Sequence, residues 1–202
     1  MNTGAMAFMR GLTFPGGQQP VIHGKDVYLR YPRMGDYAGW AAVRGESREF
    51  LSPWEPVWAS DELSKSAYRR RIKRYQKETR QDSAYAFFVF RKEGDVLMGG
   101  CTLSNVRRGV TQCCALGYWI GARFARQGYM FDAARSLVPF VFATLGLHRI
   151  EAACVPSNEP SKNLLTKIGF RQEGLARGYL QINGEWRDHA LFALLADEAP
   201  VG

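Results

Sequence analysis

The sequence has 202 residues with a formal net charge of +8, and 46% of the residues are hydrophobic. This length and composition suit one globular domain with a single core. No stretch approaches the roughly 18 consecutive apolar residues that a membrane-spanning helix needs, so no such helix is expected.

The N-terminal segment differs in composition from the rest of the chain. Residues 1–22 are rich in Gly, Gln and Pro and lack the continuous apolar run of an export signal. We therefore expect a flexible leader at 1–22, a single domain over 23–197 and a cytoplasmic protein. The cysteines agree with a reducing compartment, because none has Cys-x-x-Cys or Cys/His ligand spacing. Buried free thiols, with no metal site, are expected at Cys101, Cys113, Cys114 and Cys154.

The first half of the domain predicts one strand, two helices and three further strands. Residues 26–31 alternate as a half-buried strand does, and Asp36 is the expected cap of a helix that follows. A loop with two prolines, 50–58, separates this helix from a second one that begins after Ser60 or Asp61 and ends near residue 80. Short turns then connect three strands into an antiparallel meander. These strands are expected at 84–91, 96–106 and 110–120.

The helix expected over 61–80 carries much of the positive charge. It has eight basic residues against three acidic ones, which accounts for five of the eight net charges. Such a helix either binds a negatively charged partner or presents an ordinary solvated face. Both interpretations remain open from the sequence.

The second half predicts a long helix, a strand, a short helix and a final hairpin. The long helix runs from Gly128 to about Leu145 and contains Pro139, which has no explanation from the sequence. A strand at 148–155 and a short helix ending at Gly169 follow. Strands at 172–182 and 185–195 are joined by Asn183-Gly184, a strong hairpin signal. Because a helix links the fourth and fifth strands, that pair should be parallel within a mostly antiparallel α/β sheet of seven strands and about four helices.

The segment Gly117–Gly128 leads from a strand into the long helix. The first turn of a helix has backbone N–H groups without intrahelical partners, at the positive end of the helix dipole. This arrangement suits a pyrophosphate. The segment contains neither GxGxxG after the strand nor GxxxxGK[ST], so hydride and phosphoryl transfer are disfavoured. A phosphate-bearing carrier such as coenzyme A fits better.

Four segments together carry a family resemblance: FLSPWEPV at 50–57, SNVRRGVTQCCALGYWIGARFARQGYMFDA at 104–133, HRIEAACVPSNEPSKNLLTKIGFRQEG at 148–174 and GYLQINGEWRDHALFAL at 178–194. In order and spacing they resemble the GCN5-related N-acetyltransferase (GNAT) superfamily over residues 25–195. Within it they resemble the RimJ/RimL type, closest to the branch that acetylates N-terminal alanine of a ribosomal protein. The resemblance implies the GNAT fold, direct acetyl transfer to an α-amino group, and acetyl-CoA as cosubstrate without a metal.

The resemblance also implies where acetyl-CoA binds. The fourth and fifth strands splay apart, the gap takes the pantetheine arm, and the next helix takes the pyrophosphate. The phosphate loop of the family, Q/R-x-x-G-x-G/A, here begins with Ala125 and ends with Met130, so the backbone is expected to bind. Arg126 either adds charge to the site or is a solvated loop residue. The expected cofactor-binding residues are Trp119, Ile120, Gly121, Arg126, Gln127, Gly128, Tyr129, Met130 and Asn158.

The expected catalytic residues are Ser161 and Glu55. Many GNAT enzymes protonate the leaving thiolate with a tyrosine, and the helix position that usually holds it is Leu165 here. Ser161, at the start of the same helix, is the implied substitute, although a serine there also suits helix capping alone. Glu55 is the first candidate for the general base and Glu151 the second, and a reaction without a dedicated base is the third possibility.

Acceptor binding is expected from the proline-containing loop and the final hairpin, through Trp54, Tyr179 and Trp186. Alternatively, Trp186 only packs on the sheet. The implied partners are a protein or peptide N-terminus, a ribosomal protein first, and the ribosome or its RNA through the helix at 61–80. Two other functions compete: acetylation of a small-molecule amine, and a non-catalytic acyl-CoA-binding or ribosome-binding module.

Overall fold

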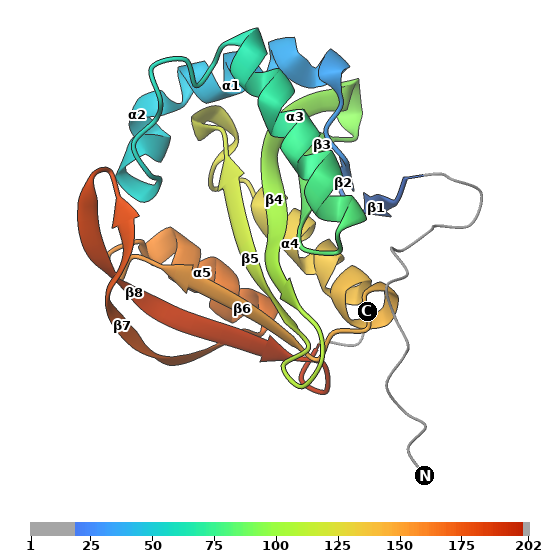
Figure 1. Ribbon diagram of the computed structural model, residues 1–202, viewed down its shortest axis with the longest axis vertical. Helices are drawn as coiled ribbons and strands as arrows, with labels where there is room; N and C mark the ends of the chain where they lie inside the picture. The colour runs from blue at the N-terminus through green and yellow to red at the C-terminus, as the bar shows by residue number, and fades with distance from the viewer. Residues whose placement is uncertain (1–18, 200–202) are drawn as a thin grey trace.

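The computed structural model describes residues 19–199. They form one eight-stranded sheet with helices on both faces, in the strand order β1-β2-β3-β4-β5-β6-β8-β7 (Figure 1). Every neighbouring pair is antiparallel except β5 and β6. The strands are β1 (Val21–His23), β2 (Val27–Arg30), β3 (Tyr85–Arg91), β4 (Val96–Arg107), β5 (Cys113–Ile120), β6 (Arg149–Cys154), β7 (Arg171–Ile182) and β8 (Glu185–Leu195).

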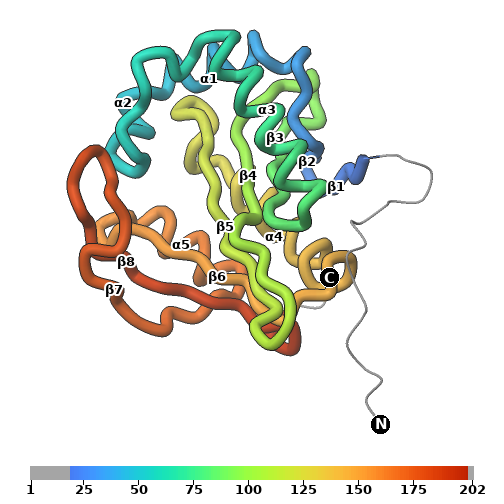
Figure 2. Tube along the Cα trace, viewed as in Figure 1, coloured from blue at the N-terminus to red at the C-terminus, as the bar shows by residue number. Residues whose placement is uncertain are grey.

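Five α-helices surround this sheet. Figures 1 and 2 show α3 in front of the sheet and α4 behind it, with α1 and α2 passing over the end of β5. Helix α5 packs beside α4. The helices are α1 (Tyr37–Glu46), α2 (Arg48–Leu51), α3 (Lys65–Arg80), α4 (Tyr129–Pro139) and α5 (Glu159–Ile168).

The core lies on both faces of β3. Residues Tyr85 to Phe90 are all buried, because α3 covers one face of the strand and α4 the other. On the α3 face, Trp40 and Tyr68 pack with ring centroids 4.9 Å apart. On the α4 side, Phe87 meets Phe140 edge to face at 5.4 Å. Aromatic pairs of this kind add to the stabilisation from burial alone.

The parallel pair opens soon after it forms. Register between β5 and β6 covers only three residue pairs, from Cys113 opposite Arg149 to Ala115 opposite Glu151. β5 continues to Ile120 without β6 as its partner. The predicted parallel and splayed pair is therefore confirmed, and the gap between the two strands is where a ligand can reach strand backbone.

Several local predictions are confirmed. Gly128 begins α4 with φ of 87°, and Gly169 ends α5 with φ of 115°, both in the left-handed region that favours glycine. Asn183 and Gly184 form the turn of the β7–β8 hairpin. The four cysteines are buried free thiols.

Three predictions need correction. The sheet has eight strands, not seven, because β1 begins at Val21 and pairs with β2; the rest of the expected leader, residues 1–18, lies outside the described residues. Helix α3 begins after Ser64, whose Oγ accepts from the Ala67 N–H at 3.1 Å, and not after Ser60 or Asp61. Asp36 precedes α1 as expected, but its carboxylate binds the Arg30 guanidinium instead of capping the helix.

Pro139 marks a change in the long helix. Proline has no N–H for the helical hydrogen bond and its ring crowds the preceding turn. The chain continues past it as a π-helical segment, η6 (Phe140–Thr144), in which the Leu145 N–H donates to the Phe140 carbonyl at 2.9 Å. The wider turn keeps Phe140 and Val141 in the core, so the helix continues with altered geometry rather than ending at the proline.

No helix within residues 19–199 is long and apolar enough to cross a membrane. The same range contains no group of three or more His, Cys, Asp or Glu residues placed to hold a metal ion.

Candidate active site

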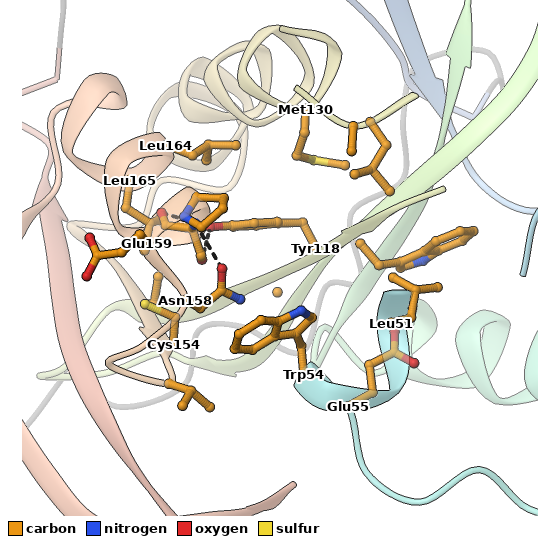
Figure 3. A pocket seen from close by; sticks show the side chains of 18 of the residues that line it. Leu51, Trp54, Glu55, Tyr118, Met130, Cys154, Asn158, Glu159, Leu164 and Leu165 are labelled. Atoms are coloured by element: carbon orange, nitrogen blue, oxygen red, sulfur yellow. Dashed lines mark hydrogen bonds between the residues drawn. The ribbon is translucent and has the colours of Figure 1, made fainter. Parts of the chain in front are cut away.

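A cavity of about 1040 Å³ occupies the gap between β5 and β6 (Figure 3). Its first wall is β5, its second is β6 with the start of α5, and its two ends are the entrance of α4 and the loop that follows α2. The lining residues used below are Trp54, Glu55, Tyr118, Ile120, Arg126, Gly128, Met130, Cys154, Asn158, Ser161, Leu165 and His189.

The β5 wall presents backbone groups to this gap. In an antiparallel pair, successive residues direct their N–H and C=O groups alternately to one neighbour and to the other side. The Gly121 N–H donates to the Met98 carbonyl at 2.8 Å, so the backbone N–H and C=O groups of Gly121 and Trp119 point toward β4. Ile120 and Tyr118 therefore direct their backbone toward the gap, beyond the last residues paired with β6. Of the expected donors on β5, Ile120 is well placed, whereas the amides of Trp119 and Gly121 are used within the sheet.

The entrance of α4 forms one end of the cavity. Arg126 and Gly128 both have positive φ, 61° and 87°, which turns the chain sharply into the helix. The N–H groups of Tyr129, Met130 and Phe131 in the first turn have no hydrogen-bond partner within residues 19–199. Unpaired donors at a helix N-terminus attract an anion.

The side chains at this entrance divide into two groups. Arg126, exposed, and Met130 line the cavity, as expected. Gln127 does not, because its side-chain amide donates to the Arg123 carbonyl at 2.7 Å. Tyr129 is also absent from the lining, so only its backbone N–H is available to a ligand there.

The α5 wall brings two predicted residues together. Asn158 caps α5, its Oδ1 accepting from the Ser161 N–H at 3.1 Å. Its Nδ2 has no partner among the described residues and is directed into the cavity (Figure 3). The side-chain oxygen of Asn158 thus caps α5, and its NH2 group is left for a ligand.

Tyr118 is the site residue that sequence reasoning missed. Its side chain crosses from β5 to α5, where its Oη lies 2.6 Å from Ser161 Oγ (Figure 3). Burial raises the pKa of the Tyr118 phenol above its ordinary value, against a smaller opposing effect of the bond with Ser161. The usual position of a family tyrosine, Leu165, is a buried apolar residue of the lining. The expected gap between the two strands predicted a ligand site, but no signal in the sequence indicated that a β5 side chain reaches the α5 cap.

Glu55 lines the cavity, but its carboxylate is engaged. Oε1 accepts from Arg44 Nη1 at 2.7 Å, and Oε2 accepts from Arg44 Nη2 at 2.7 Å and from Trp58 Nε1 at 2.8 Å. The buried Arg44 guanidinium lies over Trp58, 4.2 Å from its ring centroid, and 5.0 Å from that of Trp119. Three of the roughly four acceptor positions of the Glu55 carboxylate are thus occupied. This geometry suits a residue that fixes the loop better than one that removes a proton.

The loop carrying Trp54 and Glu55 is tied to the final hairpin. The Asn183 N–H donates to the Glu55 carbonyl at 2.8 Å, so the loop after α2 and the β7–β8 turn meet over one end of the cavity. Trp54 lines the cavity and faces its interior (Figure 3). Tyr179 and Trp186, predicted to contact the acceptor, are 49% and 69% exposed and lie outside the lining. That Tyr179 and Trp186 contact the acceptor therefore stays a prediction.

His189 comes from the same hairpin and does line the cavity. It is buried, its Nδ1 lies 3.0 Å from the Arg187 carbonyl, and its ring packs edge to face on Tyr179. The alternative base Glu151 is elsewhere: it pairs with Arg107 and Arg149 and is not part of the lining. Cys154 lines the cavity, and burial raises the pKa of its thiol, which disfavours a thiolate nucleophile.

These walls combine anion-binding N–H groups, a strand edge with free backbone groups, and a hydroxyl pair between them. An elongated ligand that carries phosphate groups fits such a cavity. The family model described as Acetyltransferase (GNAT) domain matches residues 26–171. The chain belongs to the GNAT acetyltransferase family and is an N-acetyltransferase.

Relatives and solved structures agree with this family. The chain is 36% identical over 182 residues to the ribosomal protein uS5-alanine N-acetyltransferase of Escherichia coli (strain K12). The alignment covers 90% of this chain and 89% of that protein. It is similar to Mycobacterium smegmatis RimJ in complex with CoA-disulfide, with a TM-score of 0.86, 30% identity and 91% of each chain covered. A ribosomal-protein-S5-alanine acetyltransferase from Vibrio fischeri matches with a TM-score of 0.82 and 28% identity, over 90% of this chain and all of that one.

Proposed function

We propose that this enzyme transfers the acetyl group of acetyl-CoA to the α-amino group of an N-terminal alanine of a ribosomal protein. The observation that carries the proposal is the cavity at the β5–β6 gap, with an anion-binding helix entrance at one end and a loop and hairpin meeting at the other. The substrate class comes from the relatives, two of which are named for alanine acetylation of a ribosomal protein. Such an acceptor is made in the cytoplasm, where we place the reaction.

The residues of the cavity fit acetyl-CoA. The unpaired N–H groups of Tyr129, Met130 and Phe131 suit its pyrophosphate, with Arg126 as a nearby positive charge. The backbone of Tyr118 and Ile120, facing the gap, suits the amides of the pantetheine arm. The free Nδ2 of Asn158 supplies one more donor to the same arm. Bound there, acetyl-CoA supplies an activated acetyl thioester.

The acceptor amine needs little help from a base. An α-amino group has an ordinary pKa of about 7.7–8.0, so about one molecule in ten is the free amine near pH 7. Positioning of that amine against the thioester and stabilisation of the oxyanion should therefore carry most of the rate. Glu55 has about one acceptor position left, which suits a hydrogen bond from the acceptor ammonium rather than a full proton transfer.

We propose that Ser161 protonates the leaving group. In direct transfer the nitrogen–carbon bond forms, the carbon–sulfur bond breaks, and the coenzyme A thiolate takes a proton. Ser161 lines the α5 wall of the cavity, and its Oγ lies 2.6 Å from Tyr118 Oη of the β5 wall. A positioned proton donor contributes typically 10²–10⁴-fold to a rate.

Purified enzyme incubated with acetyl-CoA and an alanine-led peptide should release coenzyme A and gain one acetyl group on the peptide. Ser161→Ala should lower kcat by about 100-fold and leave acetyl-CoA binding unchanged. Release should be measured with a thiol reagent and the product by mass. The same peptide blocked at its N-terminus is the control.

The outcomes separate the competing functions. Transfer to a small amine but not to the alanine-led peptide would contradict the proposed substrate. Acetyl-CoA binding without transfer to either would indicate a non-catalytic binding module. A Ser161→Ala variant with the turnover of the wild type would remove Ser161 from the mechanism.

We further propose that α3 docks on ribosomal RNA. Three of its arginines are paired with acids, Arg70 with Asp61, Arg71 with Glu62 and Arg74 with Glu78. A second set of basic residues in α3 is exposed and has no ion pair within residues 19–199. Its members follow one another at spacings of four, four, four and three residues. Four residues rise roughly 6 Å along a helix, so the set forms one cationic ridge. The ridge consists of Lys65, Arg69, Lys73, Lys77 and Arg80.

Changing Lys65, Arg69, Lys73 and Lys77 together to Gln should weaken binding to ribosomal particles and make it less sensitive to salt. Four lost phosphate contacts should reduce the slope of log affinity against log salt concentration by about 3. The control is Arg70→Gln/Arg74→Gln, which removes cations that are already paired. Binding by the wild type that does not weaken with salt would contradict the docking proposal, while acetylation of the free peptide should persist in both variants.

A further inference from the structure

We propose that Tyr118 is a positioning residue of the acetyl transfer: its hydroxyl donates to Ser161 Oγ and aims the Ser161 hydroxyl hydrogen at the leaving sulfur. The inference rests on the proposed function of the cavity. It makes the acid of the reaction a unit of two hydroxyls, one from each wall of the β5–β6 gap. The tyrosine that is absent at Leu165 is thereby replaced from the opposite wall.

The geometry of the pair carries the inference. Tyr118 Oη lies 2.6 Å from Ser161 Oγ and 3.5 Å from the Ser161 carbonyl oxygen. Both residues line the cavity, and they are 43 positions apart in the sequence. The bond spans the gap past Ala115, where β5 and β6 no longer pair. It therefore holds a hydroxyl at the place where the two cavity walls have separated.

The direction of the hydrogen bond follows from what each hydroxyl has available. Ser161 has one hydroxyl hydrogen, and its backbone N–H is already used by the Asn158 cap. If that hydrogen were given to Tyr118, none would face an anion in the cavity. A thiolate in the cavity favours the arrangement in which Tyr118 donates to Ser161, because a hydroxyl that accepts a hydrogen bond becomes a stronger donor to an anion. Tyr118 then donates to Ser161, and Ser161 donates to sulfur.

Burial helps Tyr118 to keep its hydrogen. The raised pKa of the phenol means that the neutral, donating form persists to more alkaline pH than for an exposed tyrosine. The titratable groups that face it are Cys154 and Cys101, both neutral as buried thiols. The donor therefore stays intact across the range in which the acceptor amine loses its proton.

The proton inventory of the step closes without a further reagent. As the carbon–sulfur bond breaks, the Ser161 proton moves to sulfur. The acceptor nitrogen, on forming its bond to carbon, releases one proton, which returns to Ser161 through water. Tyr118 keeps its own proton and stabilises the negative charge that develops on Ser161 Oγ.

The test compares Tyr118→Phe, Ser161→Ala and the double variant in the acetyl-CoA and alanine-peptide assay. Tyr118→Phe keeps the ring and removes one oxygen. We expect kcat to fall roughly 10- to 100-fold with the KM for acetyl-CoA within about 2-fold of the wild type. Because both residues act through one hydrogen bond, the double variant should be no slower than Ser161→Ala alone.

The matched control is Tyr85→Phe. Tyr85 is also a buried strand tyrosine whose hydroxyl is hydrogen-bonded, to Asp82 at 2.5 Å, but it lies outside the cavity lining. It should lose some thermal stability and keep the kcat of the wild type. An unchanged kcat in Tyr118→Phe would overturn the inference. So would a double variant whose kcat lies below that of Ser161→Ala by the same factor by which Tyr118→Phe alone lowers the kcat of the wild type. Absence of acetyl transfer by the wild type would instead overturn the proposed function, so the two failures are distinguishable.

Discussion

Glu55→Gln is expected to lower the free energy of unfolding by about 3 kcal/mol. Arg44, whose side chain is 7% exposed, would lose its bidentate partner and remain a buried cation between two indole rings. Removing one partner of a buried ion pair typically costs 3–5 kcal/mol, because the other charge stays desolvated. Glu62, 3.9 Å from Arg44, compensates in part, so the lower end of this range applies. Denaturant unfolding monitored by tryptophan fluorescence measures the loss.

Two further variants isolate the cause. Arg44→Met/Glu55→Gln keeps an unbranched side chain between the rings without the charge, and it should recover at least half of the lost stability. Arg70→Gln breaks the ion pair with Asp61, in which the side chains of Arg70 and Asp61 are 63% and 47% exposed. It should change the free energy of unfolding by less than about 0.5 kcal/mol. A double variant as unstable as Glu55→Gln would contradict the buried-charge explanation.

The same variant decides between the two roles of Glu55. If its carboxylate fixes the loop, the pH–rate profile of folded Glu55→Gln should keep the shape of the wild type at a lower height. If the carboxylate removes the proton of the acceptor, the part of the profile that reports ionisation of Glu55 should disappear, and only the rise from the free acceptor amine should remain. The occupied oxygens of Glu55 favour the first result.

Gly99→Ala is expected to disrupt the β5 wall of the cavity. A Cβ at this position would lie 2.3 Å from the Trp119 carbonyl oxygen and 3.1 Å from the Ile120 Cα, both backbone atoms that cannot rotate away. The strands β4 and β5 would have to separate where Ile120 presents its backbone to the gap. Overpacking typically costs 1–3 kcal/mol, and we expect about 3 kcal/mol here together with weaker acetyl-CoA binding.

Gly117→Ala is the control in the facing strand. A Cβ there meets nothing within 4 Å, and the backbone is not in the left-handed region. Its stability should change by less than about 0.5 kcal/mol. Thermal unfolding compares the stability of both variants, and calorimetric titration with acetyl-CoA compares Gly99→Ala with the wild type, because Gly117 itself lines the cavity. A Gly99→Ala variant as stable as Gly117→Ala would show that β4 and β5 tolerate a closer contact than this packing implies.

The fold was largely predictable because most of its elements have local signals. Hairpin turns such as Asn183-Gly184 and a terminal glycine such as Gly169 located element boundaries to within a few residues. The errors fall where such signals are weak. β1 has only three residues, and the start of α3 offered several capping residues between Ser60 and Ser64.

The site was predictable only in part. The helix entrance at Gly128 and the α5 cap at Asn158 depend on residues close together in sequence, and both are part of the cavity. Glu55 was found, but its partner Arg44 was not, since eleven residues and a change of direction separate them. Tyr118 was missed because no local pattern relates a strand tyrosine to a serine 43 residues later.

The local conformations of this protein follow from short stretches of its sequence: strand alternation, glycine at positive φ, and a helix start with unpaired N–H groups near Gly117–Gly128. Which groups meet across the cavity depends on how the elements pack together. The β5–β6 gap opens because the pairing ends at Ala115, and only then can Tyr118 reach Ser161. Hydrogen bonds and ion pairs between elements form only at short distances. Those distances are set by the packing of the whole sheet, which no short stretch of sequence specifies.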